Sequence, residues 1–243
     1  MIALIAGDLA NAADLRAPPT YKAPIVAPGY SWSGCYLGGH VGGGWGRKRF
    51  SPDLTFPFFH PFFSPTSVDT DGFLGGGQVG CDYQFATNWV IGVEGAVSWS
   101  NLRGDAPDLQ STVDNVVYHV KTDWIATATG RVGYAWDRWL VYAKGGAAWA
   151  HDKYNATGQD TGALFDFGAT ETRLGWTVGA GVEWAFWNNW STKVEYNYMD
   201  FGSRSLRFVN SIPPAFAIPA PGNVDQKIHA IKFGLNYRFG GKP

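Results

Sequence analysis

The sequence contains no run of about 18 apolar residues, the length that a membrane-spanning helix needs. Charged residues are also scarce, at 16% of the chain, whereas a soluble domain has about 25%. Aromatic residues reach 16%, and there are 32 glycines. This chain is too apolar for an ordinary soluble domain and too interrupted for membrane helices. It therefore fits a β-barrel, the other structure that satisfies its backbone inside lipid.

The chain also lacks an excess of one charge and a cluster of cysteines. Its formal net charge of −1 gives no electrostatic basis for binding nucleic acid. Cys35 and Cys81 do not have the spacing of metal ligands. They fall on two neighbouring predicted strands, so two interpretations stay open. One is a disulfide formed in an oxidising periplasm, and the other is two small apolar thiols on the outer face.

Residues 139–149 have the pattern of one complete crossing of an outer membrane. Every second side chain, from Trp139 to Trp149, is apolar, and at about 3.3 Å per residue and a tilt of roughly 40° the segment rises about 25 Å. Residues 89–99 repeat the tryptophan spacing, and residues 190–198 begin the same way. Five residues after each leading tryptophan, a charge falls on the opposite face: Glu94, Lys144 and Glu195.

Eight segments of this kind predict an all-β fold, an eight-stranded antiparallel up-and-down transmembrane β-barrel. Three tight turns, each ending in Asn or Arg directly before a Trp, alternate with four connections of about twenty or more residues, as in barrels with short periplasmic turns and long external loops. Both termini are then periplasmic. The predicted strands cover approximately residues 34–45, 73–85, 89–99, 120–136, 139–149, 170–186, 190–199 and 227–239.

The N-terminal region divides into two parts ahead of the barrel. Residues 1–12 contain a short apolar run and a small-x-small triplet, so we interpret them as the remnant of a signal peptide from a start codon assigned too late. Residues 13–30 are rich in proline and form an extended periplasmic lead-in. The predicted outer-membrane β-barrel comprises residues 31–243.

Several motifs along the chain resemble a known family. They are Ala13-Asp14-Leu15 with its proline-rich continuation, and residues 32–39, 130–134, 142–146, 175–183 and 193–196. In this order they are similar to the small outer-membrane immunogenic β-barrel proteins of α-proteobacteria, also described as porin-family proteins. The resemblance implies an eight-stranded barrel in the cell outer membrane of a Gram-negative bacterium, with surface-exposed loops and a role in envelope integrity. In some members it also implies haem binding or a pore.

The resemblance also implies partners: outer-membrane lipid, and the barrel-assembly machinery, which reads the C-terminal strand. Such proteins usually finish on an aromatic residue, whereas here Phe239 is followed by residues 240–243, so recognition of the last strand is expected to be weaker. We expect a monomer or a weak homo-oligomer.

The charges on the predicted inner face form a candidate network. An eight-stranded barrel has an interior just wide enough to be filled by side chains, so these charges have to pair with one another or with trapped water. We expect Arg131 to bridge Glu94, Lys144 to reach Glu183, and Glu195 to reach Lys193 or Lys232. The main interpretation is a polar core that plugs the barrel, and the alternative is a narrow pore for ions or small solutes. The network comprises Asp82, Glu94, Arg131, Lys144, Glu183, Lys193, Glu195, Lys232 and Arg238.

Tryptophans at the ends of the apolar faces predict an aromatic girdle at the two membrane interfaces. A soluble ligand-binding barrel of the lipocalin type is the competing architecture. It would place the apolar face inside and the charges outside, so the orientation of the two faces distinguishes the two. The predicted girdle comprises Trp89, Trp99, Trp139, Trp149 and Trp190.

No catalytic, cofactor-binding or metal-binding residue is predicted, and no cofactor is expected. His119 lies near Asp114 and Asp123, and His151 is adjacent to Asp152, but no nucleophile motif accompanies either pair. An alternative is a haem or another apolar ligand bound by His60 within the phenylalanine-rich residues 56–63. The sequence therefore predicts a structural, surface-exposed protein of the outer membrane that contributes to envelope integrity and surface interactions and is not an enzyme.

Overall fold

The computed structural model describes residues 29–52, 66–107, 117–160, 163–206, 209–210 and 222–239. No helix in these ranges is long and apolar enough to cross a membrane. The predicted signal-peptide remnant, His60 with residues 56–63, and Asp114 lie outside them. The strands are β1 (Gly34–Pro52), β2 (Thr66–Phe85), β3 (Trp89–Pro107), β4 (Val117–Trp136), β5 (Trp139–Asp160), β6 (Ala163–Trp184), β7 (Trp190–Leu206), β8 (Val209–Asn210) and β9 (Gly222–Phe239).

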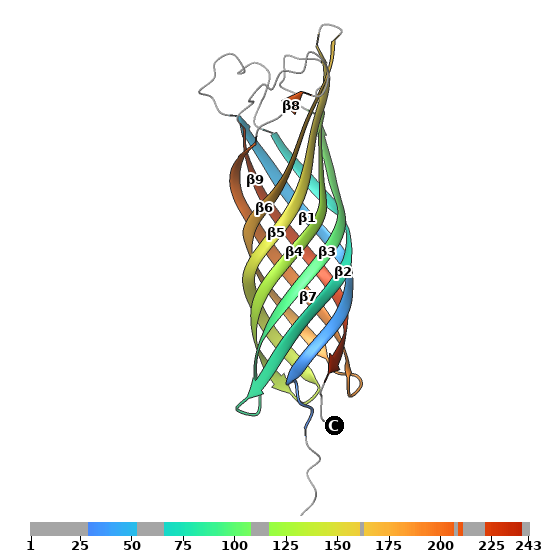
Figure 1. Cartoon of the computed structure of the whole chain (residues 1–243), viewed down its shortest axis with the longest axis vertical. Coiled ribbons are helices and arrows are strands. Elements are labelled where there is room, and N and C mark those ends of the chain that lie inside the picture. Colours follow the sequence, from blue (N-terminus) through green and yellow to red (C-terminus); the bar gives the residue numbers. More distant parts are fainter. Residues whose placement is uncertain are drawn as a thin grey trace, which may run out of the picture.

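The eight long strands form one closed antiparallel barrel. Each strand pairs with the next along the chain, β7 pairs with β9, and β9 pairs with β1 to close the ring (Figure 1). The two-residue strand β8 pairs with β6 beyond the part of β6 that contacts β7. The predicted eight-stranded up-and-down barrel is therefore confirmed.

The two faces of the barrel differ in polarity because the side chains of a strand alternate in direction. Outward residues are apolar and exposed, as for Phe73 at 78% and Val41 at 66%, whereas the inward Lys144 is only 6% exposed. A lipocalin-type barrel requires the opposite arrangement. The competing architecture is thus excluded, and the outer face matches the lipid-facing band of a transmembrane barrel.

In each tight turn, the residue before the leading tryptophan donates a side-chain hydrogen bond to a backbone carbonyl at the end of a neighbouring strand. Asn88 Nδ2 donates to Ala135 O at 2.7 Å, and Asn189 Nδ2 donates to Arg238 O at 2.8 Å. Arg138 Nη1 makes the equivalent bond to Ala185 O at 3.2 Å. These bonds give a structural reason for the Asn or Arg that precedes each Trp in the sequence.

The strands extend further than the apolar alternation predicts. The sequence predicted that β1, β3 and β5 end near residues 45, 99 and 149. In the structure they end at Pro52, Pro107 and Asp160. The apolar alternation reports only the part that faces lipid, whereas backbone pairing continues wherever two strands remain side by side. Several polar side chains that the sequence assigned to loops therefore lie on strands.

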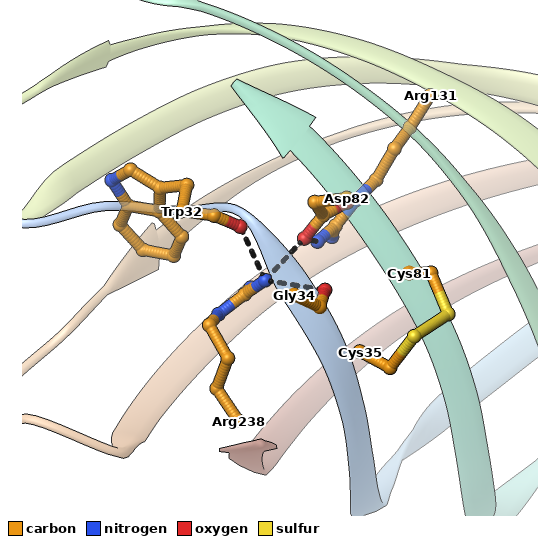
Figure 2. Close-up of a disulfide and its surroundings, with 7 residues drawn as sticks. All are labelled: Trp32, Gly34, Cys35, Cys81, Asp82, Arg131 and Arg238. Carbon is orange, nitrogen blue, oxygen red and sulfur yellow. Dashed lines mark hydrogen bonds and ion pairs between the residues drawn. A yellow bond between two sulfur atoms is a disulfide. The ribbon is translucent and has the colours of Figure 1, made fainter. Parts of the chain in front are cut away.

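The two cysteines form a disulfide on the outer face of the barrel (Figure 2). Cys35 of β1 lies directly opposite Cys81 of β2 in the strand register, and their Cα atoms are 3.9 Å apart. Of the two interpretations that the sequence left open, the structure shows the disulfide.

Candidate functional site in the barrel interior

All nine charged residues of the predicted network lie inside the barrel. Their exposed fractions range from 0% for Glu183 and Arg238 to 6% for Asp82 and Lys144. A charge buried to this extent is costly unless it is paired and hydrogen-bonded. The contacts of these residues therefore decide what the interior can do.

Two lysines and two glutamates form a ring, here called the central ring. Lys144 Nζ lies 2.9 Å from Glu94 Oε1 and 2.6 Å from Glu195 Oε1. Lys193 Nζ lies 2.6 Å from Glu94 Oε2 and 3.3 Å from Glu195 Oε2. Each charge thus has two partners of opposite sign, and the ring is neutral in sum. The spacing from the leading tryptophans placed Glu94, Lys144 and Glu195 at one depth, and the structure brings them together.

Tyrosine hydroxyl groups complete the hydrogen bonding of the central ring. The Tyr36 hydroxyl donates to Glu94 Oε2 at 2.7 Å, and the Tyr142 hydroxyl donates to Glu195 Oε2 at 2.9 Å. Asn197 Nδ2 donates to Glu195 Oε1 at 2.7 Å. The carboxylates therefore accept hydrogen bonds from neutral donors as well as from lysines, which reduces the cost of burying them.

A second cluster lies nearer the periplasmic end, here called the arginine cluster. Arg131 Nε donates to Asp82 Oδ1 at 2.7 Å, and Arg131 Nη1 donates to Glu183 Oε2 at 3.2 Å. Its guanidinium lies between the rings of Tyr36 and Tyr142, 4.8 Å and 5.0 Å from their centroids. Such cation–π contacts add to the electrostatic compensation of a buried arginine.

Two of the expected pairings are wrong. Arg131 pairs with Asp82 and Glu183 rather than with Glu94, and Lys144 pairs with Glu94 and Glu195 rather than with Glu183. The reason is the strand register, in which the residue of β4 opposite Glu94 is Thr129, so Arg131 lies two residues nearer the periplasmic end. Glu195 pairs with Lys193, one of its two expected partners.

Lys232 belongs to a third, mostly uncharged level. Its Nζ donates to Ser98 Oγ at 3.3 Å, and His40 Nε2 is hydrogen-bonded to the same oxygen at 2.7 Å. His40 also contacts Gln78 through Nδ1, and Gln78 Nε2 donates to Asn236 Oδ1 at 2.7 Å.

Beyond this level, most of the inward side chains are apolar. They form one cluster of buried residues, here called the apolar layer: Leu74, Leu102, Ile125, Ala148, Ala150, Met199, Phe201, Ile228 and Ala230. An apolar layer inside a polar interior offers no hydrogen bonds to a passing ion or water molecule. It separates the charges below it from those at the external end.

The external end of the interior holds buried charges that the sequence analysis missed. Lys48 Nζ lies 2.7 Å from Asp152 Oδ1, which also accepts a hydrogen bond from Thr122 Oγ1 at 2.5 Å. Arg173 Nη1 donates to Val224 O at 2.8 Å. Lys48 and Asp152 were missed because the sequence analysis assigned both residues to loops, whereas in the structure they lie on β1 and β5. Arg173 precedes the outward Leu174, so strict alternation could have identified it.

The histidines considered for catalysis take other positions. His119 Nδ1 lies 2.6 Å from Asp105 Oδ1 on the exposed surface. His151 is hydrogen-bonded to Thr172 Oγ1 at 2.9 Å, and its ring stacks on Trp124. Asp152 points into the interior, away from His151. Over the part of the chain that the structure describes, no group of three or more His, Cys, Asp or Glu residues could hold a metal ion.

Beyond the apolar outer band, Asp123 is held between two lysines. Its carboxylate oxygens lie 2.7 Å from Lys121 Nζ and 2.7 Å from Lys153 Nζ. The hydrogen bond from Lys121, followed by that from Lys153, lowers the pKa of Asp123 below its usual value. This carboxylate fixes β4 to β5 at a bulge in their register.

The aromatic residues of the predicted girdle lie at the ends of the outer face. Trp89, Trp139 and Trp190 begin their strands and contact Tyr134, Trp184 and Tyr237 on the neighbouring strands. Trp99 is 67% exposed towards the other end, and Trp149 is half-buried there.

Comparison with known proteins gives relatives for the whole barrel. Residues 11–239 match the family model described as outer membrane protein beta-barrel domain. The chain is 33% identical over 236 residues to the 31 kDa outer-membrane immunogenic protein of Brucella melitensis biotype 1, covering 90% of this chain and 89% of that one. It is 33% identical over 181 residues to the 22 kDa outer membrane protein of Rhizobium leguminosarum bv. viciae, covering 74% and 69%.

Among solved structures, the crystal structure of the outer membrane protease OmpT from Escherichia coli aligns with a TM-score of 0.54 at 8% identity, covering 88% of this chain and 99% of that chain. At this identity the likeness concerns the fold alone. The family match and the outer-membrane relatives agree with the apolar outer face and the closed ring of strands. The chain therefore belongs to the outer-membrane β-barrel family that includes these immunogenic proteins, and it resides in the outer membrane of Gram-negative bacteria.

Proposed function

We propose that this protein is a structural, surface-exposed component of the outer membrane with a closed interior, and that it contributes to envelope integrity and surface interactions. The observation that carries the proposal is the sequence of layers inside the barrel. The arginine cluster and the central ring lie below the apolar layer, and the Lys48–Asp152 pair lies beyond it. Neither compensated charges nor packed apolar side chains provide a continuous aqueous path.

The alternative is a narrow pore for ions or small solutes, and one feature favours it. Lys144 and Lys193 each contact both Glu94 and Glu195, so these partners are interchangeable and could exchange as an ion passes. Such an exchange would not open the apolar layer, because its side chains carry no polar group that could bind a passing ion. The closed interior is therefore the function class that these contacts favour.

We propose no enzymatic activity for this chain. The His40–Ser98 hydrogen bond has the atom types of a hydrolase base and nucleophile, but Ser98 is 1% exposed and His40 is 5% exposed. A substrate would have to pass the apolar layer or the central ring to reach this hydroxyl. Surface binding of haem or another apolar ligand by His60 concerns residues outside the described ranges and stays a proposal.

We further propose that the protein acts as a monomer or a weak homo-oligomer in outer-membrane lipid, and that the barrel-assembly machinery reads β9. The strand ends with two outward-facing aromatic residues, Tyr237 and Phe239, on either side of the inward Arg238.

The experiment that tests the envelope role compares cells with and without the protein. Loss of the protein is expected to increase sensitivity to detergent and entry of large antibiotics. Wild-type protein expressed from a plasmid should restore the barrier, whereas a variant that fails to assemble should not. Unchanged permeability in the cells that lack the protein would contradict a role in envelope integrity.

A further inference from the structure

One guanidinium nitrogen joins the last strand of the barrel to the first two. Arg238 Nη1, on β9, donates to Trp32 O at 2.6 Å and to Gly34 O at 3.2 Å, and it lies 2.8 Å from Asp82 Oδ2 (Figure 2). Gly34 is the first residue of β1, Trp32 lies two residues before it, and Asp82 lies on β2. The Arg238 side chain is fully buried. The three oxygens, here called the arginine-receiving site, come from two chain segments, residues 32–34 and β2, and need a fixed relative position.

The disulfide supplies that fixed position. Cys35 directly follows Gly34, and Cys81 directly precedes Asp82, so the bond holds together the backbone segments that carry the receiving oxygens (Figure 2). Because neighbouring residues of a strand face opposite ways, the sulfur atoms lie outside the barrel while the Asp82 carboxylate lies inside. Cys35 is also the register partner of Phe239, so the disulfide lies beside the β1–β9 seam.

The position of the disulfide affects how easily it could form in the finished barrel. Cys81 lies opposite Val93, which is 64% exposed on the outer face and two outward positions above Trp89. In the finished barrel, the sulfurs therefore lie on the lipid-facing surface near its periplasmic edge, beside Phe239 at the end of β9, where the membrane restricts access of a water-soluble protein oxidant. Thiol–disulfide exchange also needs a thiolate, which forms readily in water and not in lipid.

We propose that the Cys35–Cys81 disulfide forms in the periplasm before the barrel closes, and that it assembles the arginine-receiving site that guides β9 into register. The oxidant is a periplasmic disulfide-carrying protein of the thiol–disulfide oxidoreductase class. One cysteine thiolate attacks the oxidant's disulfide to give a mixed disulfide and one oxidant thiolate. The second cysteine thiolate then attacks the cysteine sulfur of the mixed disulfide. The oxidant leaves as a dithiol that carries the two electrons and the two protons.

Strand register explains why an arginine at this position is selective. A slip of β9 by one residue turns Arg238 towards lipid, and a slip by two residues brings the shorter Asn236 to the receiving oxygens. Arg238 reaches all three oxygens only in the native register. A preassembled receiving site therefore distinguishes the native β1–β9 register from slips of one or two residues. This selectivity does not depend on whether the finished barrel conducts ions.

The test measures how fast the full chain refolds from urea into detergent micelles, with the disulfide intact or kept reduced. Folded and unfolded forms are separated by SDS gel electrophoresis of unheated samples. The oxidised wild type should fold roughly tenfold faster than the reduced protein, because the hairpin ends are already joined. Cys35→Ser/Cys81→Ser should fold at the reduced rate under both conditions. In Arg238→Gln, most of the advantage of oxidation should disappear.

Two further variants keep the test decisive. Arg47→Gln removes an exposed arginine that pairs with Asp69 between the same two strands at their other end, and it should keep the full advantage of oxidation. If Arg238→Gln does not fold, Arg238→Lys replaces it and should lose part of the advantage, since an ammonium reaches fewer of the oxygens. Equal rates for oxidised and reduced wild type, or an unchanged advantage in the folding-competent Arg238 variant, would overturn the proposal.

A second measurement tests the timing in cells. Newly made chains are pulse-labelled, their free thiols are trapped with a maleimide, and folded and unfolded chains are separated on gels without reductant. Unfolded periplasmic chains should already carry the disulfide. A disulfide that appears only in folded barrels would overturn the proposed order.

Discussion

Lys144 Nζ lies 2.9 Å from Glu94 Oε1, although fifty residues separate the two in the chain. Both side chains are buried, and neither can be moved to water while the barrel stays closed. Their contact belongs to the central ring, whose other members are Lys193 and Glu195. The stability of the barrel should therefore depend on these four side chains, which also fill one of the levels that close its interior.

The first prediction concerns the central ring. Lys144→Met leaves two glutamates facing one lysine, and the loss of one partner from a buried ion pair is expected to cost about 3–5 kcal/mol of unfolding free energy. Adding Glu94→Gln should restore part of it, because Lys193 and Glu195 then remain as a balanced pair. Urea unfolding in detergent micelles measures both effects.

The matched control for the central ring is Arg47→Met, which removes an exposed ion pair with Asp69 and should change stability little. Strictly additive effects of the Lys144 and Glu94 substitutions would show that the two residues do not interact.

The second prediction concerns the lipid-facing band. Val141→Arg places a charge near the membrane midplane and is expected to cost about 2–4 kcal/mol and to impair assembly. Asn155→Arg, on the same face of β5 but beyond the band, should assemble as the wild type does. Folding yield in lipid vesicles measures the difference, and equal yields for the two variants would contradict the assigned lipid face.

The third prediction concerns the periplasmic turns. Asn189→Ala removes the 2.8 Å hydrogen bond to Arg238 O and should lower stability by about 1 kcal/mol. The adjacent Asn188→Ala should have a smaller effect, since its Oδ1 accepts only a 3.5 Å bond from Arg138. Urea unfolding should rank the two variants in this order, and the reverse ranking would show that Asn189 does not fasten the turn.

The fourth prediction concerns pH. Since Lys121 and Lys153 hold the pKa of Asp123 below its usual value, this carboxylate contributes stability above its unfolded pKa of about 3.9 and loses it as the pH falls through the lower folded value. Carboxyl NMR in micelles should give a midpoint below that of an unfolded chain. Lys121→Met should raise it. A midpoint unaffected by Lys121→Met would show that the lysine does not hold the carboxylate.

Period-two alternation and the spacing of the tryptophans predicted the barrel, the orientation of its faces and the common depth of Glu94, Lys144 and Glu195. These features are local, because each depends on one strand and on where that strand begins. The repeat of Asn or Arg before Trp was also visible in the sequence, but its bonds to the next strand end were not.

Contacts between strands could not be predicted in the same way. The partners of Arg131 depend on the register between β3 and β4, and the Cys35–Cys81 bond depends on the register between β1 and β2. Crowding inside the barrel is also hidden from the sequence. By alternation Gly146 is an ordinary inward position, but a Cβ there would lie 2.1 Å from Ala128 O, so a larger side chain does not fit.

The most direct test of the closed interior is electrical recording from the purified protein in a planar bilayer. Because compensated charges and an apolar layer fill successive levels of the interior, we expect no steady current above the leak of the bare bilayer, with a known porin as the positive control. A steady conductance that rises with salt concentration and with the amount of inserted protein would contradict the closed interior.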